Sequence, residues 1–126
     1  MTRIKNIQPH FQNQIDKAVK DLLASYDEDI DVSDIKGYVV DSSRGRAYFE
    51  GGQFTVPIWT ITKRPKGYFV YYTAHELSHK LKFKKYGIEG PGHNAEFYEI
   101  FTKLCPVHLQ HHELHYKKSC KKYGIK

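Results

Sequence analysis

The sequence predicts a single domain of the α+β class that spans residues 1–126. Its length suits one domain with a sizeable core. Apolar residues recur at helical spacing near the N-terminus and again from about residue 68 onward. Between these regions, β-branched and aromatic residues are concentrated between short turn signals. We therefore expect an N-terminal helix, then strands, then further helices.

The N-terminal helix is expected from Pro9 to Tyr26, because apolar residues recur there every three or four positions. These residues are Phe11, Ile15, Val19, Leu22, Leu23 and Tyr26. An acidic segment, Asp27–Asp34, follows and contains five carboxylates. Their spacing is not that of an EF-hand, so we expect a solvated loop rather than a cation site.

Three strands are expected next, at Ile35–Val40, Arg46–Glu50 and Gln53–Thr62. The turns between them are short, at residues 41–45 and 51–52, and short turns predict a three-stranded antiparallel meander. Pro57 cannot donate a ladder hydrogen bond, so the third strand is expected at a sheet edge or a bulge. Such an edge could hold an extended peptide through main-chain hydrogen bonds, or it could simply face solvent.

The following helix, expected from Tyr68 to Lys85, contains the segment His75–His79 with the sequence HELSH. Residues four apart on a helix differ by about 40° around the axis and about 6 Å along it, so both histidines can bind one metal ion. Glu76 lies about 100° round from His75 and can reach a water molecule on that metal. An apolar stripe on nearly the opposite side indicates that this helix is covered twice. The stripe comprises Val70, Ala74, Leu77 and Leu81.

A third ligand is expected from the next helix, which follows the glycine-rich loop Tyr86–Gly92 and starts near His93. His93 shares an apolar stripe with Phe97, Ile100 and Leu104, and Phe101 lies beside it, so His93 is expected on the buried face of this helix. Two histidines leave a metal site incomplete, and this favours His93 as the third ligand. Glu96, one turn along, is the competing candidate.

These residues predict a zinc-dependent hydrolase. A Zn²⁺ ion with three protein ligands and one open position lowers the pKa of its water to about 7, and Glu76 can accept the proton. One alternative is a basic nucleic-acid-associated domain whose zinc is structural, which requires a fourth ligand such as Glu96. Another is a metallohydrolase that acts on a non-protein amide or ester.

The chain also resembles a known family, the SprT-like zinc metallopeptidases, over residues 35–105. The resemblance rests on HELSH and on the later Gly-Pro-Gly-His-Asn-Ala-Glu-Phe at residues 90–97, with further similarity in Gly45-Arg46 and the upstream helix and strands. It implies a zincin-like fold, zinc on His75, His79 and His93, and Glu76 as catalytic base. It further implies a protein or peptide substrate, and DNA or a DNA-bound protein as a partner, since some members cleave proteins crosslinked to DNA.

The chain departs from the family in two respects. Asn94-Ala95 replaces the residues usual after the third histidine, and the four-cysteine zinc ribbon of many members is absent, because only Cys105 and Cys120 occur. This suggests a minimal peptidase, of the type that phages or mobile elements carry.

The C-terminal segment is expected to form one last helix, Pro106–Lys122, carrying four histidines: His108, His111, His112 and His115. A zinc site joining these to Cys105 and Cys120 is disfavoured, because one helix would spread them over about 20 Å. One of these histidines, or Tyr116, could stabilise the oxyanion of a hydrolysis intermediate, and the sequence does not choose between them.

Composition sets the remaining expectations. The formal net charge of +6 permits an acidic partner such as nucleic acid but equally suits a basic domain without one. Two cysteines are too few for a disulfide framework, no signal peptide is apparent, and no apolar run reaches membrane-spanning length. We expect a soluble protein of the cytoplasm that is not secreted and binds no membrane.

Overall fold

The computed structural model describes residues 9–47, 51–87 and 92–125 and has the predicted α+β composition. The elements, in chain order, are α1 (Pro9–Ser25), β1 (Lys36–Val40), β2 (Gln53–Pro57), α2 (Trp59–Thr62), α3 (Tyr68–Tyr86), α4 (Ala95–Leu104), the 3₁₀ helix η1 (Val107–His112) and α5 (Tyr116–Tyr123). Within these described ranges, no helix combines the length and the apolar character that crossing a membrane requires.

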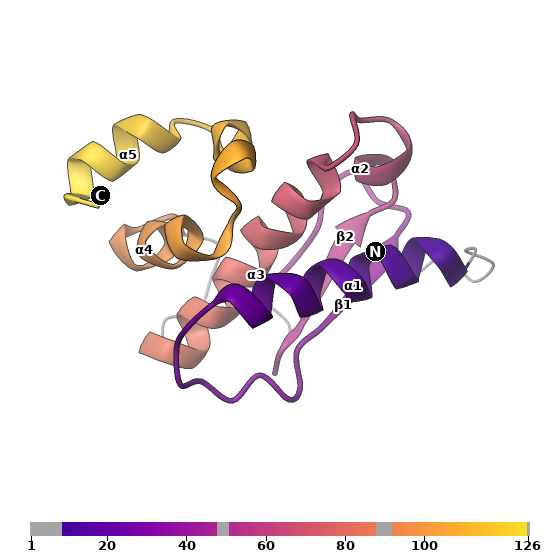
Figure 1. The fold of residues 1–126 in the computed structure, drawn as a ribbon, viewed down its shortest axis with the longest axis horizontal. Coiled ribbons are helices and arrows are strands. Elements are labelled where there is room, and N and C mark those ends of the chain that lie inside the picture. The colour runs from indigo at the N-terminus through magenta and orange to yellow at the C-terminus, as the bar shows by residue number, and fades with distance from the viewer. Residues whose placement is uncertain (1–8, 48–50, 88–91, 126) are drawn as a thin grey trace.

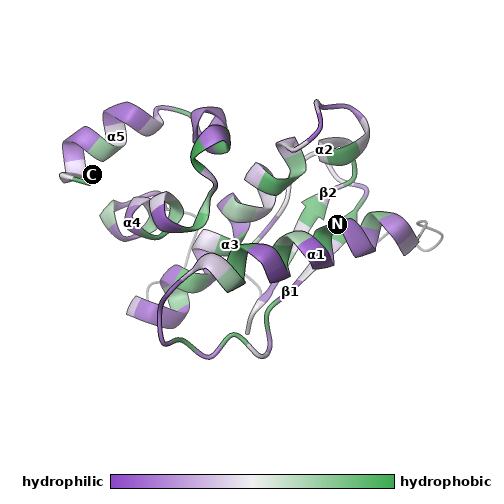
Figure 2. Ribbon diagram, viewed as in Figure 1, coloured by the Kyte–Doolittle hydropathy of each residue, from purple (hydrophilic) through white to green (hydrophobic). Residues whose placement is uncertain are grey.

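Helix α3 runs through the middle of the molecule and carries the HELSH segment (Figure 1). It contacts α1 and β2 on one side and α4 and η1 on the other. Three members of its predicted apolar stripe, Ala74, Leu77 and Leu81, are fully buried. The expectation that α3 is covered twice is therefore confirmed. Helix α5, by contrast, is largely hydrophilic and buries none of its residues (Figure 2).

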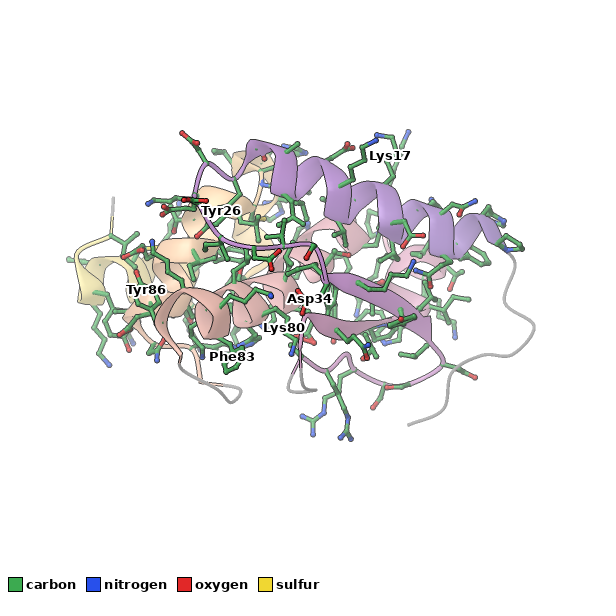
Figure 3. The ribbon with its side chains drawn as sticks, turned by 90° about the horizontal axis from the view of Figure 1, so that it is seen from below. Lys17, Tyr26, Asp34, Lys80, Phe83 and Tyr86 are labelled. Atoms are coloured by element: carbon green, nitrogen blue, oxygen red, sulfur yellow. The ribbon has the colours of Figure 1, made fainter. Side chains whose placement is uncertain are left out.

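Helix α1 matches its predicted boundaries to within one residue and packs its apolar stripe inward. Tyr26 points toward the body of the molecule while Lys17 points away from it (Figure 3). The Gln12 side chain fixes α1 to β1, because its amide donates to the Gly37 carbonyl and accepts from the Val39 amide. This pairing satisfies backbone groups on the outer side of β1.

The predicted three-stranded antiparallel meander is wrong. The described residues form a two-stranded sheet in which β1 and β2 are parallel, with Lys36 opposite Gln53 and Val40 opposite Pro57. A parallel pair needs a crossover rather than a tight turn, and residues 41–47 and 51–52 are the described parts of this crossover. Of the expected middle strand Arg46–Glu50, residues 46 and 47 are not in a strand, and residues 48–50 lie outside the described residues.

The Gly51-Gly52 pair explains the error. Gly52 lies against the start of β1: its carbonyl accepts from the Lys36 amide, and an added Cβ would come within 2.9 Å of the Asp34 carbonyl oxygen. The pair thus permits close approach of two backbones at the beginning of both strands, instead of reversing the chain between two antiparallel strands. The crossover runs past the outer edge of β2, where the Thr55 amide donates to the Arg46 carbonyl.

The end of the expected third strand folds as helix α2. Strand β2 stops at Pro57, and the Thr60 hydroxyl donates to the Pro57 carbonyl to hold the new turn. Trp59 is tied to the crossover by a bond from its indole N–H to the Ser43 carbonyl. Tertiary packing thus overrides the strand preference of the β-branched residues in this segment.

The predicted continuous C-terminal helix is also wrong. The chain forms η1 and α5 with a break between them, where His115 has a left-handed φ of 57°. Glu113, in this break, is buried, with an exposed fraction of 6%. From this break its carboxylate bonds to Tyr71 and His75 on α3.

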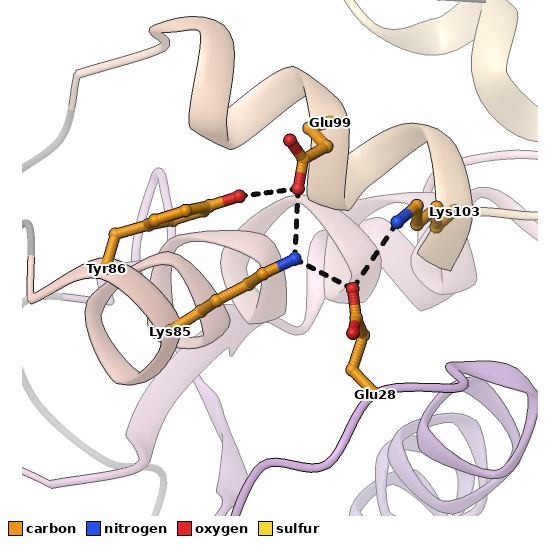
Figure 4. Close-up of polar contacts among 5 residues, drawn as sticks. All are labelled: Glu28, Lys85, Tyr86, Glu99 and Lys103. Carbon is orange, nitrogen blue, oxygen red and sulfur yellow. Dashed lines mark hydrogen bonds and ion pairs between the residues drawn. The ribbon is translucent and has the colours of Figure 1, made fainter.

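The acidic segment 27–34 forms a loop as expected, but its carboxylates are not simply solvated. Glu28 accepts hydrogen bonds from Lys85 at 2.7 Å and from Lys103 at 3.4 Å, and Lys85 also reaches Glu99 at 3.0 Å (Figure 4). The Tyr86 hydroxyl donates to the same Glu99 carboxylate at 2.6 Å. This network joins the loop to the C-terminal end of α3 and to α4.

We predict that Lys85→Met lowers the urea midpoint of unfolding at pH 7 and that the deficit narrows at pH 3.5. Hydrogen bonds from Lys85 and Lys103 lower the pKa of Glu28, and those from Tyr86 and Lys85 lower the pKa of Glu99. A carboxyl with a lowered pKa stabilises the fold above its ordinary pKa of about 4.3, and this stabilisation is lost as the pH falls through the folded-state pKa.

The matched control is Lys17→Met, which removes an exposed ion pair with Asp21 on α1. We expect its midpoint to change little at either pH. An equal deficit for Lys85→Met at pH 7 and pH 3.5 would contradict the assigned role of the network.

Candidate metal centre

Three histidines meet at one point beside α3. The Nε2 atom of His93 lies 3.2 Å from Nε2 of His75 and 3.2 Å from Nε2 of His79. All three ligand atoms lie within 4.8 Å of one another. The three histidines are therefore close enough to hold a metal ion.

This arrangement fits a tetrahedral ion better than it fits hydrogen bonding alone. Metal–nitrogen bonds of 2.0–2.1 Å at tetrahedral angles place two imidazole nitrogens about 3.3 Å apart, close to the observed 3.2 Å. A neutral imidazole has one N–H, so the single Nε2 of His93 cannot donate to both neighbours. A shared cation satisfies all three lone pairs at once.

His93 is brought to the site by a loop, not by a helix as predicted. Helix α4 begins at Ala95, because Asn94 is its N-cap and accepts the Phe97 amide at 3.1 Å. His93 precedes this cap. The preceding residue, Gly92, is held by Lys82 on α3, whose Nζ donates to the Gly92 carbonyl at 2.8 Å. Both contacts fix the backbone on either side of the third histidine.

Glu113 orients His75 from the break between η1 and α5. Its carboxylate lies 2.6 Å from His75 Nδ1 and accepts the Tyr71 hydroxyl at 3.1 Å. A carboxylate only accepts, so His75 Nδ1 carries the hydrogen and the Nε2 lone pair faces the other histidines. Burial works to lower the pKa of His75, but the hydrogen bond and charge of Glu113 outweigh it and raise the pKa.

His79 is oriented by packing. Its Nδ1 is buried and has no hydrogen-bond partner among the residues that the structure describes, while its ring centroid lies 4.6 Å from that of Phe97. Burial, with the positive charges of His75 and His93, lowers the pKa of His79 to about 2. The ring is thus held in the neutral form that binds metals.

Glu76 lies where the sequence places it, beside the histidines and facing a cavity of about 410 Å³. It is 6% exposed. Burial raises the pKa of its carboxyl to about 7, although the positive charge of His75 opposes this. A bound divalent cation would favour the carboxylate form. A carboxyl group with a pKa near 7 can accept and return a proton at neutral pH.

The crossover forms the opposite wall of this cavity, through residues 44–47. Gly45 approaches Glu76 so closely that an added Cβ would lie 2.8 Å from its Oε2 atom and would overlap the Thr55 carbonyl oxygen. The Gly45 amide donates to the Tyr72 hydroxyl at 2.7 Å. Arg46 pairs with Thr55 at the outer edge of β2, so at Thr55 this edge neither faces solvent nor is open to a peptide, the two possibilities that the sequence left open.

Other sequence candidates are not part of this site. Glu96, the competing third ligand, does not belong to the histidine group, and over the described ranges this group is the one set of three or more side chains placed to bind a metal. The imagined site of Cys105, Cys120 and tail histidines therefore does not form there. Tyr116 bonds to the Thr102 hydroxyl at 2.8 Å and does not line the cavity.

Three residues that sequence reasoning missed support the site: Tyr71, Tyr72 and Glu113. The first two precede His75 by four and three positions, so helical spacing alone could have placed them on its face. Glu113 had no such signal, because its contact with His75 joins residues 38 positions apart.

Comparison of this chain with protein-family models, curated proteins and solved structures found no match.

We predict about one zinc ion per purified wild-type chain and loss of most of this zinc in His93→Ala. The variant removes one of three converging nitrogens and leaves both HELSH ligands in place. Glu96→Ala is the matched control and should keep full zinc content. Elemental analysis of the dialysed proteins measures this, and full zinc in His93→Ala with loss in Glu96→Ala would reverse the ligand assignment.

We further predict that Glu113→Gln weakens zinc binding by about 10- to 100-fold, the usual cost of losing a partner that orients a ligand. The amide keeps the shape of the side chain but no longer supplies a charged acceptor to His75 Nδ1. Competition with a chromogenic chelator measures the affinity. Glu99→Gln, which alters a carboxylate outside the site, should stay within about twofold of wild type, and an equal loss in both variants would point to general destabilisation.

Proposed function

We propose that this protein is a zinc-dependent hydrolase that cleaves peptide bonds. The observation that supports this most directly is the convergence of three imidazole nitrogens beside a buried carboxyl that faces a cavity. Three protein ligands leave a fourth tetrahedral position for water or substrate, as in catalytic rather than structural zinc sites. Three neutral imidazoles also suit Zn²⁺ among the common metals.

Zinc bound at this site would polarise the scissile carbonyl and lower the pKa of a water molecule. The chain's own residues perform the remaining tasks. Glu76 accepts a proton from the attacking water and returns it to the departing amine, for which its position at the cavity suits it. His75 is kept in the metal-binding tautomer by Glu113, and the Lys82 contact to Gly92 holds the His93 loop in place.

The choice of peptide bonds over other bonds rests on the resemblance of HELSH and the His93 segment to the SprT-like peptidases. DNA or a DNA-bound protein as a partner rests on the same resemblance and on the positive net charge. Arg44 and Arg46 line the cavity, so an anionic group on a substrate or partner would be attracted to its entrance. The alternative of a structural zinc in a nucleic-acid-associated domain has less support, because a fourth protein ligand is not found among the described residues.

We predict that Glu76→Gln lowers casein-cleaving activity by at least about 100-fold while keeping about one zinc per chain, since a general base contributes about 10²- to 10⁴-fold. Labelled casein with added zinc is the assay. Glu96→Gln serves as the matched control and should cleave at the wild-type rate. Activity that persists in Glu76→Gln, or that survives a chelator, would exclude this mechanism, and cleavage of simple esters or nucleic acid instead of casein would change the substrate class.

A further inference from the structure

Tyr72 is a partly buried residue beside the three histidines of the candidate metal centre. It lies one turn before His75 on α3 and lines the cavity. Its ring centroid lies 6.5 Å from that of His75. The ring also packs edge-on against Trp59, with the two centroids 5.8 Å apart. These contacts fix the ring at the wall of the cavity that the three histidines also line.

The hydroxyl group of Tyr72 has its proton available. Its oxygen accepts the Gly45 amide at 2.7 Å, which uses a lone pair and not the O–H. Over the described part of the chain, this is the one hydrogen bond that Tyr72 makes through its side chain. A phenol has an ordinary pKa of about 10, so the proton is present at neutral pH. Tyr71 differs, because its hydroxyl proton is committed to Glu113.

Tyr72 and Glu76 meet at the same point of the cavity wall. An added Cβ on Gly45 would lie 2.8 Å from the Glu76 Oε2 atom and 2.9 Å from the Tyr72 Cε1 atom. The proton acceptor and the proton donor thus flank one glycine. Both side chains line the same cavity as the three histidines.

We propose that the Tyr72 hydroxyl donates a hydrogen bond to the oxyanion that forms on the scissile carbonyl, which makes Tyr72 a catalytic residue. This rests on the proposed hydrolase function. As the water oxygen bonds to the carbonyl carbon, the π pair of the carbonyl moves onto its oxygen, and the water proton goes to Glu76. Tyr72 keeps its own proton and stabilises the new charge, as oxyanion donors do. No C-terminal histidine lines this cavity among the described residues, nor does Tyr116.

The test compares Tyr72→Phe with Thr55→Val. Tyr72→Phe removes the donor and also the acceptor of the Gly45 amide. Thr55→Val loosens the same crossover by removing the acceptor of the Arg46 amide at 2.9 Å, but it takes nothing from the cavity. The substrate is a quenched peptide whose sequence is taken from the fragments that wild type releases from casein. A phosphinic analogue of that peptide mimics the tetrahedral oxyanion.

We expect Tyr72→Phe to lower kcat by about 10²- to 10³-fold, the usual cost of one oxyanion donor, with KM within about threefold of wild type. The affinity of Tyr72→Phe for the phosphinic peptide should fall by a similar factor as kcat, while the variant keeps its full zinc content. Thr55→Val should stay within about threefold of wild type in both constants. A Tyr72→Phe enzyme within threefold of wild type overturns the proposal, and so does an equal loss of kcat in Thr55→Val, which would indicate positioning of the crossover alone.

Failure of the hydrolase proposal itself has a different signature. Zinc-loaded wild type would then release no fragments from casein, or Glu76→Gln would be as active as wild type, and the role of Tyr72 falls with it. Loss of activity in Glu76→Gln together with full activity in Tyr72→Phe removes the Tyr72 proposal alone.

Discussion

The structure depends on the need to satisfy polar side chains on a helix that is buried on two sides. Helix α3 places buried hydroxyls, imidazoles, a carboxyl and lysines inside the protein. The hydroxyl groups of Thr73 and Ser78 donate to carbonyls one turn back on α3 itself, so they need no partner from another segment. His75, Lys82 and Tyr72 take partners from elsewhere, because an unpaired buried polar group costs about 1–3 kcal/mol, whereas His79 Nδ1 has no partner among the described residues. Those partners build the site.

Each such partner brings a distant segment to α3. His75 bonds to Glu113, which is buried at the break between η1 and α5. Lys82, only 1% exposed, draws in the Gly92 carbonyl and with it the loop that carries His93. Tyr72 holds Gly45 and the crossover against Glu76. The contacts that satisfy these polar groups of α3 therefore also position segments around the candidate metal centre.

The sequence predicted those parts whose cause is local. The apolar stripes of α1 and α3, and the spacing of His75, Glu76 and His79, follow from helical periodicity, so their placement was confirmed. His93 lies with His75 and His79 as predicted, but it precedes helix α4 and is exposed instead of lying on the buried face of that helix, because Asn94 is the N-cap.

The parts that failed have causes distant in sequence. A Gly-Gly pair looks the same whether it reverses the chain or lets two strand starts approach each other, and only the contact of Gly52 with Asp34 distinguishes these. The C-terminal histidines formed a helix-like pattern, but the buried Glu113 decides where that helix breaks. Its partner is 38 positions away, so local periodicity carries no information about it.

The position of His93 outside any helix has an energetic consequence. Two ligands belong to α3 and the third to the loop before α4, so one metal ion would crosslink the central helix to the element that packs on it. Any ion bound to the folded form and not to the unfolded chain adds its binding free energy to stability. That added stability would fall on the contact between α3 and α4, which the Glu28–Lys85–Glu99 network also supports near the C-terminal end of α3. A metal ion at the middle of α3 and the ion pairs near its C-terminal end would thus hold the same two helices together.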